Sequence, residues 1–345
     1  MKAPRGHLIV FLRTWLIISG LLCGYSISVR AQTIGKCLQG DCQNGYAVFQ
    51  WSDQTRLEGN FQAGKPAGKG VLIQADGLQI QGQINGGRFG GSVRLQYQNG
   101  EQVSGRLSGS GLENPVEIKF KDGTEFNGNL VQGQIQGPGR LGFRDGSSFE
   151  GRFQAGQMQG PGVFRFANGT ICRGAFQNGY LHGLANCQAP GRWALKAWFQ
   201  AGQAVRNVEI QWADGSSYSG AMRNGFLHGP SIWQNTKGDR YVGSVLKGRF
   251  EGRGKLNLAS GAVYEGSFHA GQFQGSGRYQ FSNGNTYAGQ FVKGQMQGQG
   301  ILRYQDGSRY EGGFVQGKRE GQGRLYASDG KLIVEGIFKK GQFQP

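Results

Sequence analysis

Residues able to support acid–base or metal chemistry are few in this 345-residue sequence. His7 lies in an apolar N-terminal segment, and His182 and His228 occupy the same place in two 23-residue repeats that lie two periods apart. If each repeat forms two strands, the two side chains are roughly 19 Å apart, because neighbouring strands lie about 4.8 Å apart. A zinc ion needs each ligand nitrogen within about 2.1 Å. We therefore expect no metal site and no cofactor.

The carboxylates follow the repeat rather than a catalytic arrangement. Glu58, Glu150, Glu265 and Glu311 stand at one position of the repeat, and most aspartates stand in predicted turns, where they satisfy backbone hydrogen bonds. No glycine-rich phosphate-binding motif ending in Lys-Ser or Lys-Thr is present. The sequence predicts no catalytic residues and a non-enzymatic protein.

Cysteine numbers favour an oxidising compartment. Besides Cys23 in the N-terminal segment, the chain has Cys37, Cys42, Cys172 and Cys187. An even number of cysteines in an exported chain predicts disulfides, here two. Four buried thiols are the alternative.

The first 31 residues differ from the rest. Lys2, Arg5 and Arg13 precede an apolar run of about 14 residues, short of the ~20 that a membrane-spanning helix needs. Val29 and Ala31 are small enough for the two positions that a signal peptidase recognises before its cleavage site. The sequence therefore predicts a signal peptide over 1–31 and a mature N-terminus at Gln32. Residues 1–31 carry four Lys/Arg and no acid, so +13 of the net charge of +17 remains and favours anionic partners. We expect export to the periplasm, the cell surface or the medium, with an uncleaved anchor as the alternative; Leu22 disfavours lipidation of Cys23.

Beyond the leader, the sequence is a glycine-rich repeat. The chain has 65 glycines but only 8 prolines, which excludes collagen, and 22 Phe, 12 Tyr and 6 Trp argue against disorder. The first apolar residue of each unit, position 0, recurs every 23 residues. It is Leu57, Ile80, Val103, Phe126, Phe149, Cys172, Leu195, Tyr218, Tyr241, Tyr264, Tyr287 and Tyr310. This period predicts an N-terminal cap and partial repeat over 32–56, twelve repeats over 57–333 and a half repeat over 334–345.

Within each unit, apolar residues alternate with polar ones, which indicates two short strands. Asp-Gly and Asn-Gly pairs such as Asp145-Gly146 link the units and are typical of tight turns. We assume that the two strands of a repeat pair so that the position numbers of facing residues add up to fifteen. Position 0 then faces position 15, the glycine at position 2 faces the glycine at position 13, and the apolar residue at position 4 faces the glycine at position 11. Cys172 and Cys187 then become direct cross-strand neighbours, and a small Cys37–Cys42 loop precedes a first strand over Tyr46–Trp51. We predict an all-β, elongated, single-layer antiparallel meander of about 26 strands.

The motifs Phe149-Glu150-Gly151-Arg152-Phe153 and Tyr310-Glu311-Gly312-Gly313-Phe314, each followed by Gly-x-Gly, resemble the MORN repeat consensus. The resemblance covers residues 45 to 341 and specifies the fold more closely than the function. Two units depart from it. We expect a distorted turn at 107–111. We also expect a kink or altered curvature in the seventh unit, where Ala197, Arg192 and Arg206 replace glycines.

Two surfaces are candidate binding sites. The aromatic face of the sheet could bind a partner protein or a second copy, or its rings could cover one another. Its candidates are Tyr218, Tyr241, Tyr264, Tyr287, Tyr310, Trp212 and Trp233. The opposite face carries a basic stripe that could bind anions or could simply keep the protein soluble. Its candidates are Arg94, Lys119, Arg140, Arg165, Lys255, Arg278, Arg303 and Arg324.

We therefore expect a non-catalytic interaction scaffold or spacer of the cell envelope. Its partner would be an envelope protein or a second copy. The alternative is a binder of anionic phospholipid or polysaccharide that uses the basic stripe. Export disfavours nucleic acid as a partner.

Overall fold

The computed structural model describes residues 34–108 and 111–345, and within them it contains 28 strands. The predicted signal peptide lies outside the described residues. The chain divides into two compact units, with the boundary between Tyr180 and Leu181.

The strands of the first unit pair antiparallel with their neighbours in chain order. They are β1 (Gly35–Gly40), β2 (Gly45–Trp51), β3 (Arg56–Gln62), β4 (Lys65–Ile73), β5 (Gln79–Asn85), β6 (Arg88–Gln96), β7 (Gln102–Ser108), β8 (Gly111–Lys119), β9 (Glu125–Val131), β10 (Gln134–Gly142), β11 (Ser148–Gln154), β12 (Gln157–Arg165) and β13 (Ile171–Gln177).

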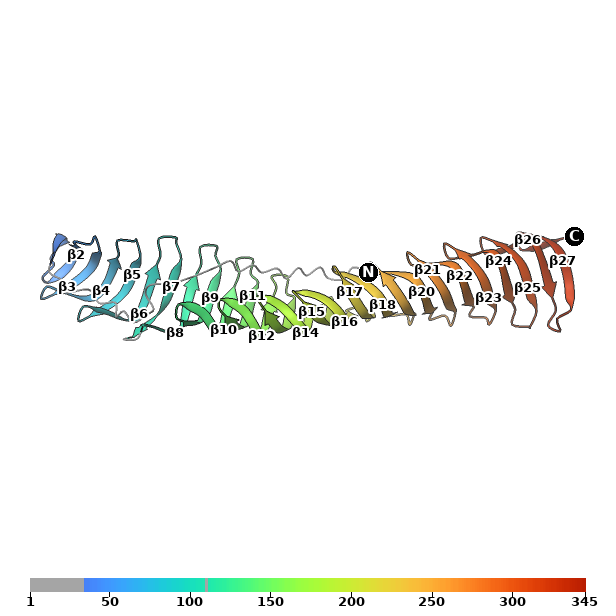
Figure 1. Cartoon of the computed structure of the whole chain (residues 1–345), viewed down its shortest axis with the longest axis horizontal. Helices are drawn as coiled ribbons and strands as arrows, with labels where there is room; N and C mark the ends of the chain where they lie inside the picture. The colour runs from blue at the N-terminus through green and yellow to red at the C-terminus, as the bar shows by residue number, and fades with distance from the viewer. Residues whose placement is uncertain (1–33, 109–110) are drawn as a thin grey trace. The chain divides into compact units, whose positions relative to one another are not determined.

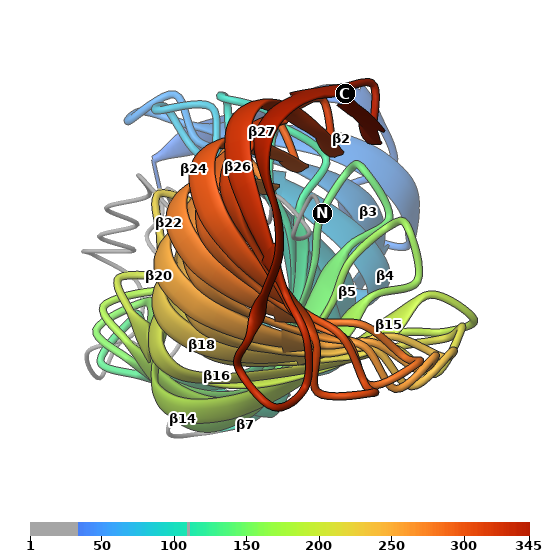
Figure 2. The ribbon, with the colours of Figure 1, turned by 90° about the vertical axis from the view of Figure 1, so that its right-hand side faces the viewer.

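The second unit is built in the same way (Figure 1). Its strands are β14 (Tyr180–Ala189), β15 (Trp193–Gln200), β16 (Gln203–Trp212), β17 (Ser217–Arg223), β18 (Phe226–Gln234), β19 (Arg240–Leu246), β20 (Arg249–Asn257), β21 (Val263–His269), β22 (Gln272–Gln280), β23 (Thr286–Val292), β24 (Gln295–Arg303), β25 (Arg309–Val315), β26 (Lys318–Tyr326), β27 (Leu332–Lys339) and β28 (Gln342–Gln344). The predicted all-β antiparallel meander is confirmed. Its strands are markedly curved in the second unit (Figure 2).

The predicted register holds over half of each hairpin. In the repeat that begins at Phe149, position 0 pairs with Phe164 at position 15, and Gly151 pairs with Gly162. The register then shifts, so that Phe153 at position 4 pairs with Met158 at position 9. The predicted pairing of position 4 with glycine 11 inside one hairpin is therefore wrong. The glycine at position 11 instead faces position 4 of the following repeat, as Gly160 faces Phe176.

The shift follows from the hairpin turn. Ala155 and Gly156, at positions 6 and 7, both have positive φ, +49° and +75°, as a two-residue turn matched to strand twist requires. Next to this turn, the position numbers of facing residues add up to thirteen, as for positions 4 and 9. Further along the hairpin they add up to fifteen, as for the glycines at positions 2 and 13. A bulge absorbs the two extra residues, and Gly160 takes a φ of +72° there.

Position 9 consequently joins positions 0, 4 and 15 on what we call the apolar face. In the repeat from Phe149 these residues are Phe149, Phe153, Met158 and Phe164, and all are buried. The side chains at positions 1, 3, 12, 14 and 16 form the opposite, polar face. Burial alternates accordingly along each strand, as in β11.

Two hairpins, β7–β8 and β15–β16, belong to the repeats that depart from the MORN consensus. The β15–β16 hairpin has two register shifts instead of one, on either side of Trp198, and Ala197 occupies a glycine position there. The β7–β8 hairpin turns between Ser108 and Gly111, so the center of the turn that was expected to be distorted, at 109–110, lies outside the described residues.

Candidate functional site

The tyrosines at position 0 are enclosed by their own repeat and its neighbours. Tyr264 lies flat over Gly266 and Gly277, where an added Cβ would come within 2.6 Å of the ring or its hydroxyl. Phe273, at position 9, stacks on this ring with centroids 3.8 Å apart. Phe268 and Phe291 stand edge-on at 5.0 and 5.1 Å. The ring is thus enclosed by glycines, a stacked ring and two ring edges.

The hydroxyl groups of these tyrosines are bound inside the sheet. Each donates a hydrogen bond to the carbonyl of position 3, as Tyr264 does to Ser267 at 2.8 Å and Tyr241 does to Ser244 at 2.8 Å. Burial raises the pKa of both Tyr241 and Tyr264 to about 12. These phenols therefore remain protonated well above neutral pH and serve packing.

The structure corrects the expectation that the tyrosines form a partner surface. Tyr218, Tyr241, Tyr264, Tyr287 and Tyr310 are at most 2 % exposed, so side chains of the sheet itself cover them. The physical reason is position 9, which the shifted register places over the ring at position 0. Trp212 and Trp233 are half-buried, and Trp233 packs against Phe250 at 5.6 Å.

The basic stripe does lie on the polar face, and all eight of its predicted members are exposed. Three of them are in ion pairs: Lys119 with Glu125 at 3.0 Å, Lys255 with Glu265 at 3.6 Å, and Arg324 with Glu335 at 2.8 Å. These acids reduce the net positive charge of the stripe at three places. The polar face is therefore a mixed-charge surface rather than a uniformly basic one.

In the first unit the polar face is hollowed. A depression of about 1200 Å³ crosses β2 to β9, and charged residues of both signs surround its glycine-lined floor. They include Glu58, Lys69, Arg94, Arg106 and Glu117. The arrangement fits a ligand with its own charges and hydrogen-bonding groups. Sequence reasoning missed the depression, although Gly90, which lines it, is an extra glycine at position 10, where Gln136 and Gln159 stand in other repeats.

A smaller depression, of about 430 Å³, lies on the polar face of the second unit. Lys196 and Glu209 pair directly across β15 and β16 at its wall, and Ile232 adds an exposed apolar side chain. It offers both ionic and apolar contacts in one place.

The histidines do not gather. His182 and His228 are half-buried at equivalent positions of β14 and β18, and His269 Nδ1 lies 3.0 Å from Glu251. Among the described residues, no group of three or more His, Cys, Asp and Glu side chains could hold a metal ion. Over the same part of the chain, no helix has the length and apolar character needed to cross a membrane.

The four cysteines within the described residues form disulfides. Cys37 and Cys42 form a disulfide that closes the β1–β2 hairpin, so Cys37 belongs to a strand that the sequence had not predicted. Cys172 and Cys187 are disulfide-bonded as well, and both are buried. The prediction that these four cysteines form disulfides is confirmed.

Comparison with models of known protein families shows to which family the chain belongs. The family model of the MORN repeat matches eight segments, which together span more than half of the chain. They are residues 58–79, 126–148, 149–171, 218–239, 241–263, 264–286, 287–309 and 310–331. The chain belongs to the MORN repeat family.

Three of the repeats that the MORN model does not match are described by their pairing as hairpins too. The β5–β6, β7–β8 and β15–β16 hairpins pair position 0 with position 15, as Ile80 with Leu95, Val103 with Ile118 and Leu195 with Ile210. What they lack is the aromatic residue at position 0. The MORN architecture thus tolerates an aliphatic residue where most matched repeats have a ring.

No curated protein matches the MORN chain in sequence. Among solved structures, it is similar to the SAS-4 (dCPAP) TCP domain of Drosophila melanogaster in complex with a proline-rich motif of Ana2 (dSTIL). That match has 15% identity and a TM-score of 0.23, and it covers 58% of this chain and 90% of that one. The wild-type TCP10 domain of Danio rerio CPAP, in complex with a peptide of Danio rerio STIL, matches with 12% identity and a TM-score of 0.19, covering 84% and 98%. Likenesses this distant carry no argument about function.

Proposed function

We propose that this MORN repeat protein is a non-catalytic interaction scaffold of the cell envelope that binds a partner protein on its polar face. The supporting observation is the contrast between the two faces of the sheet. The apolar face is covered by its own buried side chains, while the polar face is open and carries the depression that Glu58 and Glu117 line. A binder built in this way has to use its polar face or its edges.

The cysteines support the exported location. Disulfides persist in oxidising compartments and are rare in the cytosol, and all four described cysteines are bonded. A leader over 1–31 with cleavage after Ala31 would deliver the chain there. The partner would be another envelope protein or a second copy of this chain.

Site-specific photo-crosslinking in intact cells tests the polar face. A photoreactive residue replaces Gln83, which lines the depression, or Gln98, which is exposed in the inter-repeat turn of the same repeat. We expect a discrete crosslinked band in the envelope fraction from position 83 and none from position 98. No band from position 83, or identical bands from both, would contradict the proposal.

The alternative function is binding of an anionic phospholipid or polysaccharide through the basic stripe, and the exposure of all eight members favours it. Lys119, Arg165 and Arg303 stand at position 16, where other repeats have Gln96, Gln211 or Gln280. The triple substitution K119Q/R165Q/R303Q therefore removes charge with a residue that the fold already accepts. A loss of salt-sensitive binding to anionic vesicles or polysaccharide in this variant would support the alternative.

A further inference from the structure

A cluster of four side chains lies in the depression on the polar face of the first unit. Strands β6 and β7 lie side by side (Figure 1) and pair so that Ser92 faces Arg106 and Arg94 faces Ser104. All four residues line the depression, and we call them the quartet. Cβ atoms that face each other directly are about 5 Å apart, and diagonal ones are about 7–8 Å apart. The two arginines therefore occupy one diagonal of the quartet, and the two serines occupy the other.

The arginines of the quartet are poorly neutralised by the protein itself. Both cross-strand neighbours of Arg94 are uncharged, because Gln81 faces it from β5 and Ser104 faces it from β7. Arg106 approaches Glu113 at 3.5 Å, but the two side chains are 73 and 46 % exposed, so this ion pair contributes little. Guanidinium groups present several N–H donors in one plane and bind carboxylates and phosphates well. The quartet thus offers two guanidinium groups and two hydroxyl groups to one anion.

Other repeats have an acid in the place of Ser104. This serine stands at position 1, where it faces the basic residue at position 14 of the preceding repeat. At the same two positions, Lys255 contacts Glu265 at 3.6 Å and Arg324 contacts Glu335 at 2.8 Å. A glutamate is therefore compatible with the fold at this place, and the fold does not require the serine.

A second arginine diagonal in the same unit provides a comparison. Arg140 and Arg152 occupy the positions of Arg94 and Arg106 two repeats further along the chain, but Glu150 faces Arg140 there. That pair of arginines has a carboxylate beside it, whereas the pair in the quartet has a serine. The difference leaves the quartet available to a carboxylate from outside the chain.

Space for such a group exists next to the quartet. Position 10 of this repeat is Gly90, where Gln136 and Gln159 stand in other repeats. Gly90 faces Gln83 across β5 and β6, and a Cβ added to it would meet nothing within 4 Å. The depression consequently stays open on the side of the quartet that is nearest the β5–β6 hairpin turn.

The charges around the depression favour a single carboxylate over a phosphate or a polyanion. Three basic and two acidic residues line it, namely Lys69, Arg94, Arg106, Glu58 and Glu117. A doubly charged phosphate would exceed the net charge of this lining, and the two glutamates would repel a chain with an acid at every residue. The neutral lining includes amide side chains, which can hydrogen-bond to a peptide backbone. They are those of Gln81, Gln83, Asn85 and Asn127.

We propose that the quartet binds the carboxylate of one Asp or Glu side chain in an extended segment of the partner protein. This inference rests on the proposed function, because it names the chemical group by which the polar face holds its partner. The guanidinium groups of Arg94 and Arg106 would donate N–H hydrogen bonds to the carboxylate oxygens, and the hydroxyl groups of Ser92 and Ser104 would donate to the remaining lone pairs. The amide side chains along the depression would bind the backbone of the same segment.

Titration of the purified protein with capped peptides, followed by NMR, tests the site directly. One peptide contains a single glutamate among serines and glycines, and its twin contains glutamine instead. We expect saturable shifts of the β6 and β7 amide signals with the glutamate peptide, weakening with salt, and none with the twin. The variant R94N/R106Q should bind the glutamate peptide about a hundredfold more weakly, at roughly tenfold per charged hydrogen-bonding group. Asn186 and Gln83 occupy these positions in other repeats, so the fold accepts both substitutions.

Two further variants make the test specific. In S104E the new carboxylate would face Arg94 as Glu335 faces Arg324, and we expect the peptide response to disappear while the protein stays folded. In R140N/R152Q the same number of charges is removed from the other arginine diagonal, and the response should be unchanged. Overturning results are no response of the wild type, equal responses to the two peptides, or a full response in S104E. A stronger response to inorganic phosphate or to a galacturonate oligosaccharide would also overturn the proposal.

Photo-crosslinking from position 83, which lines the depression, separates this inference from the proposed function. The envelope band expected from this position should be lost in R94N/R106Q and kept in R140N/R152Q. A band that persists in R94N/R106Q would overturn the role of the quartet and leave the protein-binding function standing. Absence of the band in the wild type would contradict the protein-binding function, while the peptide titration would still decide whether the quartet binds a carboxylate.

Discussion

At the scale of single residues, the glycines of the MORN motif leave room for a ring. Gly266 and Gly277 form the floor on which the ring of Tyr264 lies, and their Cα atoms also approach each other closely across the strands. Neither Gly266 nor Gly277 has a positive φ. Absence of a side chain, rather than backbone freedom, is what these two positions require.

Substituting Gly266 by Ala tests this requirement. The new Cβ would lie 2.5 Å from the Tyr264 hydroxyl and 2.6 Å from the Cα of Gly277, so ring and strand must shift. We expect a loss of about 1–3 kcal/mol in local stability, as for overpacked cores. Amide hydrogen exchange of β21 and β22 measures it. Gly90→Ala is the matched control, because its Cβ would meet nothing within 4 Å, and unchanged exchange near Gly266 in G266A would refute the explanation.

The buried phenols predict alkaline sensitivity. Burial raises the pKa of Tyr241 and Tyr264 from 10.0 to about 12, so the folded state holds these protons more tightly than the unfolded state. Their stabilising contribution is complete below pH 10 and is lost as pH rises through about 12. Circular dichroism against pH should show unfolding in this window. The variant Y241F/Y264F should unfold at higher pH, since Phe126 and Phe149 fill the same position elsewhere.

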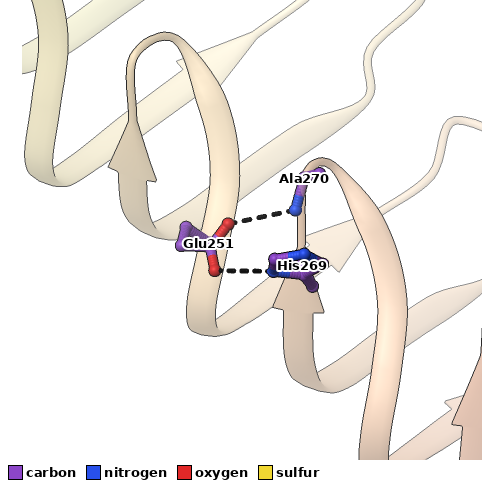
Figure 3. A network of polar contacts seen from close by, with 3 residues as sticks. All are labelled: Glu251, His269 and Ala270. Carbon is purple, nitrogen blue, oxygen red and sulfur yellow. Dashed lines mark hydrogen bonds and ion pairs between the residues drawn. The ribbon is translucent and has the colours of Figure 1, made fainter.

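At the scale of elements, one hydrogen-bonding pattern joins each hairpin to the next. Gln136, Gln159, Gln274 and Gln297, all at position 10, accept from the N–H at position 6 of the following repeat, at 2.9–3.1 Å. Glu251 does the same with one oxygen and contacts His269 with the other (Figure 3). The Ala270 N–H and, secondly, His269 lower the pKa of Glu251.

Replacing Glu251 by Ala removes this link. We expect about 1 kcal/mol less protection of the Ala270 amide in hydrogen exchange, a typical net value for one hydrogen bond. The E251Q variant should restore protection, because Gln274 makes the same bond. In the wild type the contribution should fade as pH falls through the lowered pKa of Glu251, since protonation weakens the acceptor. Equal protection in E251A and E251Q would contradict this account.

Strand number, order and face were largely predictable from the sequence, because alternation and the 23-residue period agree along the chain. The register beyond the glycine pair was not. Apolar residues at position 9, such as Phe250 and Phe273, are visible in the sequence but stand beside the turn. Their place over the tyrosine ring depends on a bulge that alternation does not reveal. Without this bulge, the residue at position 9 would not cover the tyrosine ring, which is why the sequence favoured an exposed aromatic face.

At the scale of the whole molecule, the export hypothesis and the disulfides support each other. Disulfides such as these are typical of oxidising compartments, and the predicted leader would lead to one. We expect the protein recovered from cells to begin at Gln32 by intact mass and to show no free thiol when unfolded without reductant. Retention of residues 1–21 would instead favour an uncleaved anchor, and four free thiols would contradict both disulfides.

The pairing between repeats has a genetic consequence. Tyr287 faces Tyr279 of the preceding repeat, and Tyr310 faces Leu302 in the same register, so the junction does not depend on which two repeats meet. Unequal recombination within the gene could therefore add or remove whole repeats and yield a folded product each time. Deleting residues 264–286 should give a protein with native circular dichroism and one hairpin tip fewer, because β20 would then meet Tyr287 in the register in which it now meets Tyr264. Selection could thus adjust the length of this protein in steps of one repeat, without a new core having to evolve at each step.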